Sequence, residues 1–211
     1  SLRISVKSKD PDLVGRMFTA KMIELALANY PGFFTGGGVR SGGPVLVYWP
    51  ALIDSKHIKE TVHIDGKKID VMPTNQLDLE ETYYQKQPIE IPSAPSGETI
   101  NKPLGMLFGA RSGDKGGCAN IGVWAKNENA FSFLNNFLTV KKIKELMPDL
   151  REFKIDRYEL PNILSLNFYI HDILEDGVSS NTRKDGQAKS LGEYLRAKYV
   201  DIPKSLFEEN I

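Results

Sequence analysis

The segment Gly109–Gly117, with the sequence GARSGDKGG, concentrates charged, hydroxyl and glycine residues between two expected strands. Glycines tolerate positive φ angles, which lets backbone N–H groups converge on an anion. Arg111 and Lys115 would supply positive charge, while Ser112 and Asp114 would orient the bound group and count as candidate catalytic residues. The expected binding residues are Arg111, Gly113, Lys115, Gly116, Gly117 and Asn120. This pattern favours a loop that binds phosphate or carboxylate.

The same segment also fits a purely structural hairpin loop, in which Asp114 and Arg111 hydrogen-bond locally. It does not match the phosphate-binding pattern GxxxxGK[ST], and no helix is expected directly after it. A ligand loop and a structural loop are therefore both consistent with the spacing.

Residues 163–171 show the cleanest alternation in the chain. Leu164, Leu166, Phe168 and Ile170 point to one side of the expected strand, and Ser165, Asn167, Tyr169 and His171 point to the other. His171 is a candidate general acid or base, Tyr169 a donor to an oxyanion and Asn167 a polar binding group. The alternative is that this polar face packs on another domain or subunit.

Other signals are weaker. The run Gly36–Gly43 is typical of a flexible loop, although its GVRSG resembles the later GARSG. Cys118 has no histidine partner nearby in the sequence, so an inert thiol is expected. With three histidines, at 57, 63 and 171, and one cysteine, the sequence predicts no metal site and requires no organic cofactor.

These candidate residues must be positioned by the elements around them, and the chain divides into three parts. Residues 1–72 mix strand and helix patterns, residues 73–103 hold five of the twelve prolines and resemble a linker, and residues 104–211 are again mixed. A short helix is possible over residues 77–84.

Residues 1–72 predict the order β-α-β-β. Strands are expected over residues 2–6, 45–49, 61–64 and 68–71. The helix is expected to begin after an Asp10 cap and to end before Pro31-Gly32. Asp65-Gly66 predicts a tight hairpin between the last two strands.

Residues 104–211 predict the order β-β-α-α-β-β-α. Strands are expected over residues 104–108 and 120–125, from Phe153 onward and over 163–171. Helices are expected around residues 131–138, from a Thr139 cap to Met147, and around residues 191–199. This order predicts an α+β protein with a four-stranded, largely antiparallel sheet that carries its helices on one face.

Composition excludes several classes of function. The 27 basic and 27 acidic residues balance, which argues against a general nucleic-acid binder. The longest apolar run, residues 45–53, is far shorter than the roughly 20 residues that a membrane-spanning helix needs. A single cysteine excludes an internal disulfide. We expect a cytoplasmic protein with neither nucleic acid nor membrane as a partner.

Three segments carry a resemblance to a known family. They are GARSGDKGGCANIGVWA over residues 109–125, LPNILSLNF over residues 160–168 and DGQAKSLGE over residues 185–193. Together they resemble the C-terminal domain of the acyclic terpene utilisation family, which implies a ferredoxin-like fold. Residues 26–34 and 47–52 resemble the end of the larger N-terminal domain of that family. The resemblance implies that most of this domain is missing here and is a partner of the C-terminal domain.

The resemblance implies an enzyme or enzyme subunit of acyclic terpenoid or branched acyl-CoA catabolism. A small anionic ligand or a CoA thioester would then bind at the glycine-rich segment. Two other interpretations remain open. The domain could serve assembly, with its polar sheet face docked on a partner domain or a second copy, or it could sense a ligand without turning it over.

Overall fold

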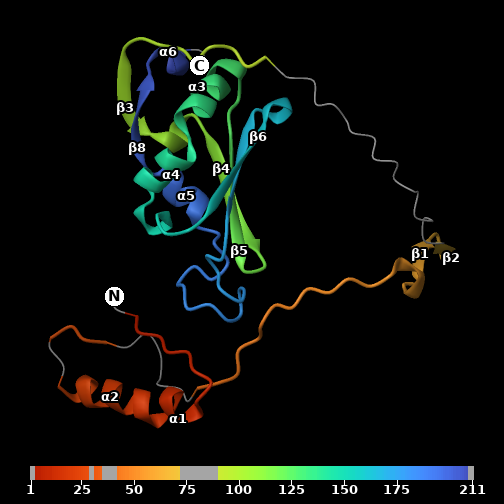
Figure 1. The fold of residues 1–211 in the computed structure, drawn as a ribbon, viewed down its shortest axis with the longest axis vertical. Helices are drawn as coiled ribbons and strands as arrows, with labels where there is room; N and C mark the ends of the chain where they lie inside the picture. Colours follow the sequence, from red (N-terminus) through yellow and green to blue (C-terminus); the bar gives the residue numbers. More distant parts are fainter. Residues whose placement is uncertain (1–2, 29–30, 35–41, 72–89, 209–211) are drawn as a thin grey trace. The chain divides into compact units, whose positions relative to one another are not determined.

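The computed structural model describes residues 3–28, 31–34, 42–71 and 90–208 (Figure 1). The chain divides into two compact units. One unit consists of residues 1–48 together with residues 91–211, and the other of residues 49–90. Residues 36–41 of the glycine run and the possible helix at 77–84 lie outside the described residues.

A four-stranded antiparallel sheet forms the centre of the larger unit (Figure 1). Its strands are β4 (Gly109–Lys115), β5 (Cys118–Trp124), β6 (Ile155–Leu160) and β7 (Ser165–Ile170), in the spatial order β4-β5-β7-β6. Every neighbouring pair is antiparallel. The predicted α+β class and antiparallel sheet are confirmed.

Three helices cover one face of this sheet: α3 (Glu128–Phe137), α4 (Val140–Leu146) and α5 (Leu191–Arg196) (Figure 1). Polar caps fix where the first two begin. The Asn127 side chain accepts from the Ala130 N–H, and the Thr139 side chain accepts from the Lys142 N–H. The predicted Thr139 cap is therefore confirmed.

The core lies between the helices and this face of the sheet. In β7, Leu166, Phe168 and Ile170 are completely buried, whereas the residues between them are half-buried. This confirms the alternation predicted for residues 163–171. The helices contribute fully buried side chains such as Leu134 and Ile143 to the same cluster.

The sequence prediction was wrong for residues 104–117. Leu104–Met106 is a short 3-10 helix (η2) rather than part of a strand. The expected glycine-rich loop is mostly strand β4, whose residues pair in register with β5 from Gly109↔Trp124 to Lys115↔Cys118. Only Gly116 and Gly117 remain as the turn. Backbone pairing to a strong neighbouring strand outweighs the low strand propensity of these residues.

A second, two-stranded sheet was not predicted. It pairs β3 (Thr99–Pro103) with β8 (Tyr199–Pro203), and a short helix α6 (Ser205–Glu208) follows. Val200 and Ile202 of β8 are buried in the main core. The end of the expected proline-rich linker thus forms a strand on the folded domain.

The N-terminal part contains helices α1 (Pro11–Val14) and α2 (Arg16–Leu27). The Asp10 side chain caps α1 as predicted, by accepting from the Asp12 N–H. Within the described residues, the strands expected at 2–6 and 45–49 do not form. Neither segment pairs with a strand among the described residues. Instead, the Lys7 side chain forms ion pairs with Glu175 and Asp176, and the Tyr48 N–H donates to the Asp176 carbonyl.

The smaller unit contains a short 3-10 helix, η1 (Ser55–His57), and the predicted hairpin of β1 (Glu60–Ile64) and β2 (Lys67–Val71). Its turn residues Asp65 and Gly66 have φ angles of 49° and 73°. Positive φ at both positions is typical of the turn that Asp-Gly favours, which confirms the prediction.

Candidate functional site

Strand register places most of the predicted site residues on the sheet face opposite the helices, which we call the open face. Arg111 pairs with Gly122, and Gly122 pairs with Asn167. In an antiparallel sheet, paired residues share a face. The open face consists of Gly109, Arg111, Gly113, Lys115, Cys118, Asn120, Gly122, Trp124, Asp156, Tyr158, Leu160, Ser165, Asn167 and Tyr169. His171, one residue past β7, joins it through its contact with Asp156. The two sequence signals, from residues 109–117 and 163–171, therefore meet on one surface.

Arg111 lies beside an unfilled position on this face. A Cβ on Gly122 would have only the Arg111 carbonyl oxygen within 4 Å, at 3.9 Å. The Arg111 side chain is exposed and forms no ion pair with any residue that the structure describes. On the neighbouring strand β5, the Asn120 side-chain amide donates to the Asn167 amide oxygen of β7 at 2.9 Å. An exposed guanidinium next to fixed amide groups is suited to binding an anionic group.

His171 and Asp156 form the most polar pair on the open face. His171 Nε2 lies 2.7 Å from Asp156 Oδ2, and their side chains are 28% and 34% exposed. The hydrogen bond from His171 lowers the pKa of the Asp156 carboxyl, and the charge of Lys154 adds to this effect. The Asp156 carboxylate thus orients the imidazole, an arrangement suited to acid–base catalysis.

Tyr169 contacts both His171 and Cys118. Its ring meets the His171 ring edge-on, with the centroids 5.0 Å apart. A hydrogen bond with the Cys118 side chain raises the pKa of the Tyr169 phenol to about 12, and burial contributes to the rise. The phenol proton is thus engaged by the Cys118 side chain. Cys118 Sγ also accepts from the Asp172 N–H at 3.4 Å.

Ser112 and Asp114, which were predicted to orient the group bound by Arg111, lie on the sheet face opposite Arg111. The Ser112 hydroxyl accepts from the Gly192 N–H at 2.8 Å and donates to the Lys189 carbonyl at 3.1 Å. Asp114 Oδ1 lies 3.9 Å from Lys189 Nζ. Because neighbouring strand residues alternate between faces, these two side chains hold the segment before α5.

The loop that was predicted to supply a cradle of N–H groups is mostly strand β4 with a two-residue turn. The ladder with β5 engages β4, and the Gly117 carbonyl accepts from the Leu174 N–H at 2.8 Å. Lys115 Nζ donates to the Asp114 carbonyl at 3.0 Å. Gly116 and Gly117 thus form the hairpin turn, and Arg111 and Lys115 are the two cations of this segment on the open face.

Sequence reasoning missed Asp156. The usable signal was the alternation of Asp156 and Tyr158 within the strand that begins near Ile155. That strand neighbours residues 163–171, but only the register Asp156↔Tyr169 shows that its carboxylate shares a face with His171.

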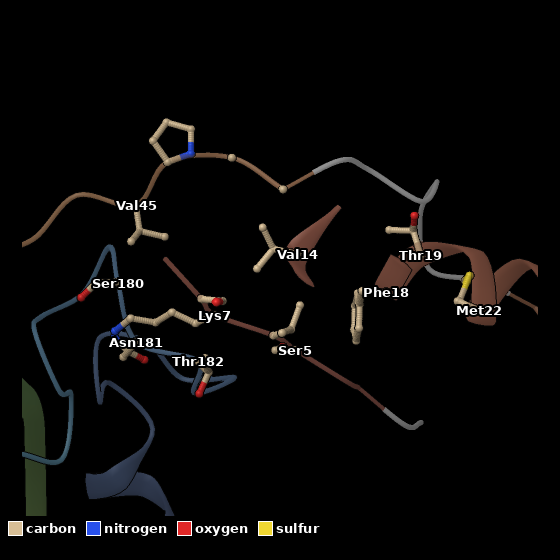
Figure 2. Close-up of a pocket in the computed structure, with 15 residues that line it drawn as sticks. Ser5, Lys7, Val14, Phe18, Thr19, Met22, Val45, Ser180, Asn181 and Thr182 are labelled. Atoms are coloured by element: carbon tan, nitrogen blue, oxygen red, sulfur yellow. The ribbon is translucent and has the colours of Figure 1, made fainter. Parts of the chain in front are cut away.

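A separate cavity of about 520 Å³ lies in the larger unit, and no open-face residue lines it (Figure 2). Figure 2 shows Lys7, Val14, Phe18, Val45 and Asn181 among its lining residues. None of the predicted site residues lines it.

The architecture and the open face define an α+β domain of ferredoxin-like type. Residues 103–201 match the family model described as the AtuA ferredoxin-like domain. Residues 1–64 match the model described as the acyclic terpene utilisation family protein AtuA. The chain belongs to the acyclic terpene utilisation family. Comparisons with curated proteins and with solved structures found no significant match.

No helix among the described residues is long and apolar enough to cross a bilayer. The same ranges contain no group of three or more His, Cys, Asp or Glu side chains placed to hold a metal ion.

Proposed function

We propose that this protein is an enzyme or enzyme subunit that acts on an anionic acyl compound, such as a branched acyl-CoA, during the use of acyclic terpenes. The observation that carries the proposal is the shared surface of Arg111 and the His171–Asp156 pair. One end of this surface offers a free cation, and the other offers an oriented imidazole. Family membership supports the metabolic setting.

In this proposal Arg111 binds the carboxylate or phosphate of the ligand. A guanidinium presents two parallel N–H donors to such a group. The space above Gly122 admits the ligand between Arg111 and Asn167, and the Asn120–Asn167 pair supplies further amide groups.

His171 is the proposed acid–base group. Asp156 holds Nε2, which leaves Nδ1 to take a proton from the ligand or return it. Tyr169 is the proposed donor to negative charge that develops on a carbonyl oxygen, for which its hydroxyl proton would turn from the Cys118 side chain to the ligand. Neither role is assigned to Ser112 or Asp114, since both are engaged by the segment before α5.

We expect Arg111→Ala to weaken binding of isovaleryl-CoA by about tenfold or more, the loss typical of one charged hydrogen-bonding partner. Isothermal titration calorimetry on the full chain measures this. The matched control is Arg151→Ala, which removes another exposed arginine that is distant in sequence and outside the open face. Equal affinity of both variants and the unaltered protein would contradict the proposed binding role.

A second candidate function is assembly, because the open face also has an apolar end. Trp124, Tyr158 and Leu160 are 40%, 51% and 41% exposed. Such side chains are enriched where proteins contact each other. The larger N-terminal domain expected for this family, or a second copy, is the proposed occupant. Assembly would be favoured if light scattering shows a dimer that Trp124→Ala abolishes and if the protein does not bind acyl-CoA. Ligand sensing would be favoured if acyl-CoA binds saturably but is not turned over.

A further inference from the structure

A cleft formed by the segment before α5 is lined mainly by positively charged side chains, which the open-face proposal does not use. It is lined by Arg183, Lys184, Asp185, Lys189 and Ser190, with a volume of about 860 Å³. Three cations and one carboxylate surround it, although the chain as a whole has equal numbers of basic and acidic residues. Such a local excess of positive charge attracts anions.

The one carboxylate of the cleft already has three donors. Asp185 accepts from the Lys189 N–H at 3.0 Å, the Ser190 N–H at 2.8 Å and the Ser190 hydroxyl at 2.6 Å. Burial opposes ionisation of Asp185, but the bonds from Ser190 and Lys189 outweigh it and lower the pKa of this carboxyl. Asp185 is thus a structural clamp, and the Ser190 hydroxyl proton is not available to a ligand.

The cations project from a backbone that is held in place. The Asn181 side-chain amide donates to the Gly177 carbonyl at 2.8 Å and to the Gly186 carbonyl at 3.1 Å. Asn181 Oδ1 in turn accepts from the Arg183 N–H at 3.0 Å. A fixed backbone lowers the entropy that binding must overcome.

None of the three cations has a tight acidic partner among the described residues. No ion pair joins the side chain of Arg183 or Lys184 to a carboxylate there. The closest carboxylate contact of Lys189 is Asp114, at 3.9 Å, and the Lys189 side chain is 63% exposed. All three cations therefore have donors to spare.

We propose that this cleft binds a phosphate- or diphosphate-bearing ligand. Arg183 supplies a planar pair of donors, and Lys184 and Lys189 supply point charges. The cleft does not include any open-face residue, so this inference rests on its own geometry and can fail or succeed independently of the function proposed above.

The test is calorimetric titration of the full chain with inorganic pyrophosphate in a buffer of low ionic strength, where charge interactions are least screened. We expect saturable binding that Arg183→Ala combined with Lys184→Ala weakens by about tenfold or more. The control removes the same charge elsewhere, by Lys126→Ala with Lys141→Ala, two exposed lysines outside the cleft. Unchanged Tm values verify that both variants fold.

Absence of saturable binding would overturn the inference, and so would an equal loss in the control variant. A second titration with CoA separates the two sources of the phosphate. If the cleft variant loses CoA as well as pyrophosphate, the cleft holds the phosphates of CoA. If it loses pyrophosphate alone, the cleft serves a free phosphate compound; either result supports the phosphate site.

Discussion

Phe168→Ala is expected to lower the free energy of unfolding by about 3–5 kcal/mol, the usual cost of removing a buried aromatic ring. Phe168 lies in β7 and is completely buried between the sheet and the helices. The loss combines the hydrophobic transfer of the ring with the cavity that remains. Urea denaturation followed by circular dichroism measures it, with the midpoint and slope fitted together.

The control for this prediction is the preceding residue, Asn167, which lies on the open face. Asn167→Ala removes one amide hydrogen bond with Asn120, so we expect a loss of about 1 kcal/mol. Similar losses for the two variants would show that the faces of β7 are not assigned as described.

Gly117→Ala is the second substitution with a large expected effect. A Cβ at Gly117 would lie 2.2 Å from the Glu175 carbonyl oxygen, which is a backbone atom. The turn and residues 174–175 must separate to admit it, and the Leu174 N–H bond to Gly117 is strained with them. We expect a loss of about 3 kcal/mol, at the upper end of overpacking costs. The same denaturation measurement applies.

Gly122→Ala is the matched control, since a Cβ there meets one atom at an ordinary 3.9 Å. Because alanine is less costly than glycine inside a strand, stability should rise by up to about 1 kcal/mol. A loss at Gly122 as large as at Gly117 would contradict the packing of the hairpin turn.

Local patterns in the sequence predicted the elements that depend on local chemistry. The strict alternation around Phe168, the Thr139 cap and the Asp65-Gly66 turn all correspond to features of the structure. Strand β4 was missed because Gly, Ser and Asp have low strand propensity, and its partner β5 supplies the stabilising ladder.

The candidate site depended on information that no single segment contains. Whether Arg111 or Ser112 shares a face with Asn167 is decided by a register shift of one residue. The sequence grouped Arg111 and Ser112 together, whereas the ladder separates them onto opposite faces. Asp156 was missed for the same reason, because it lies in β6 whereas its partner His171 follows the neighbouring strand β7.

Alkylation of Cys118 tests most directly whether the open face binds the acyl ligand. Cys118 is the one cysteine of the chain and lies on the open face beside Tyr169. Its rate of reaction with iodoacetamide can be followed by mass spectrometry with and without saturating isovaleryl-CoA. We predict that the ligand slows alkylation in the unaltered protein and that Arg111→Ala needs a ligand concentration about tenfold or more higher for the same protection. An unchanged rate, at a concentration where calorimetry shows the ligand bound, would place the ligand elsewhere and contradict the proposed site.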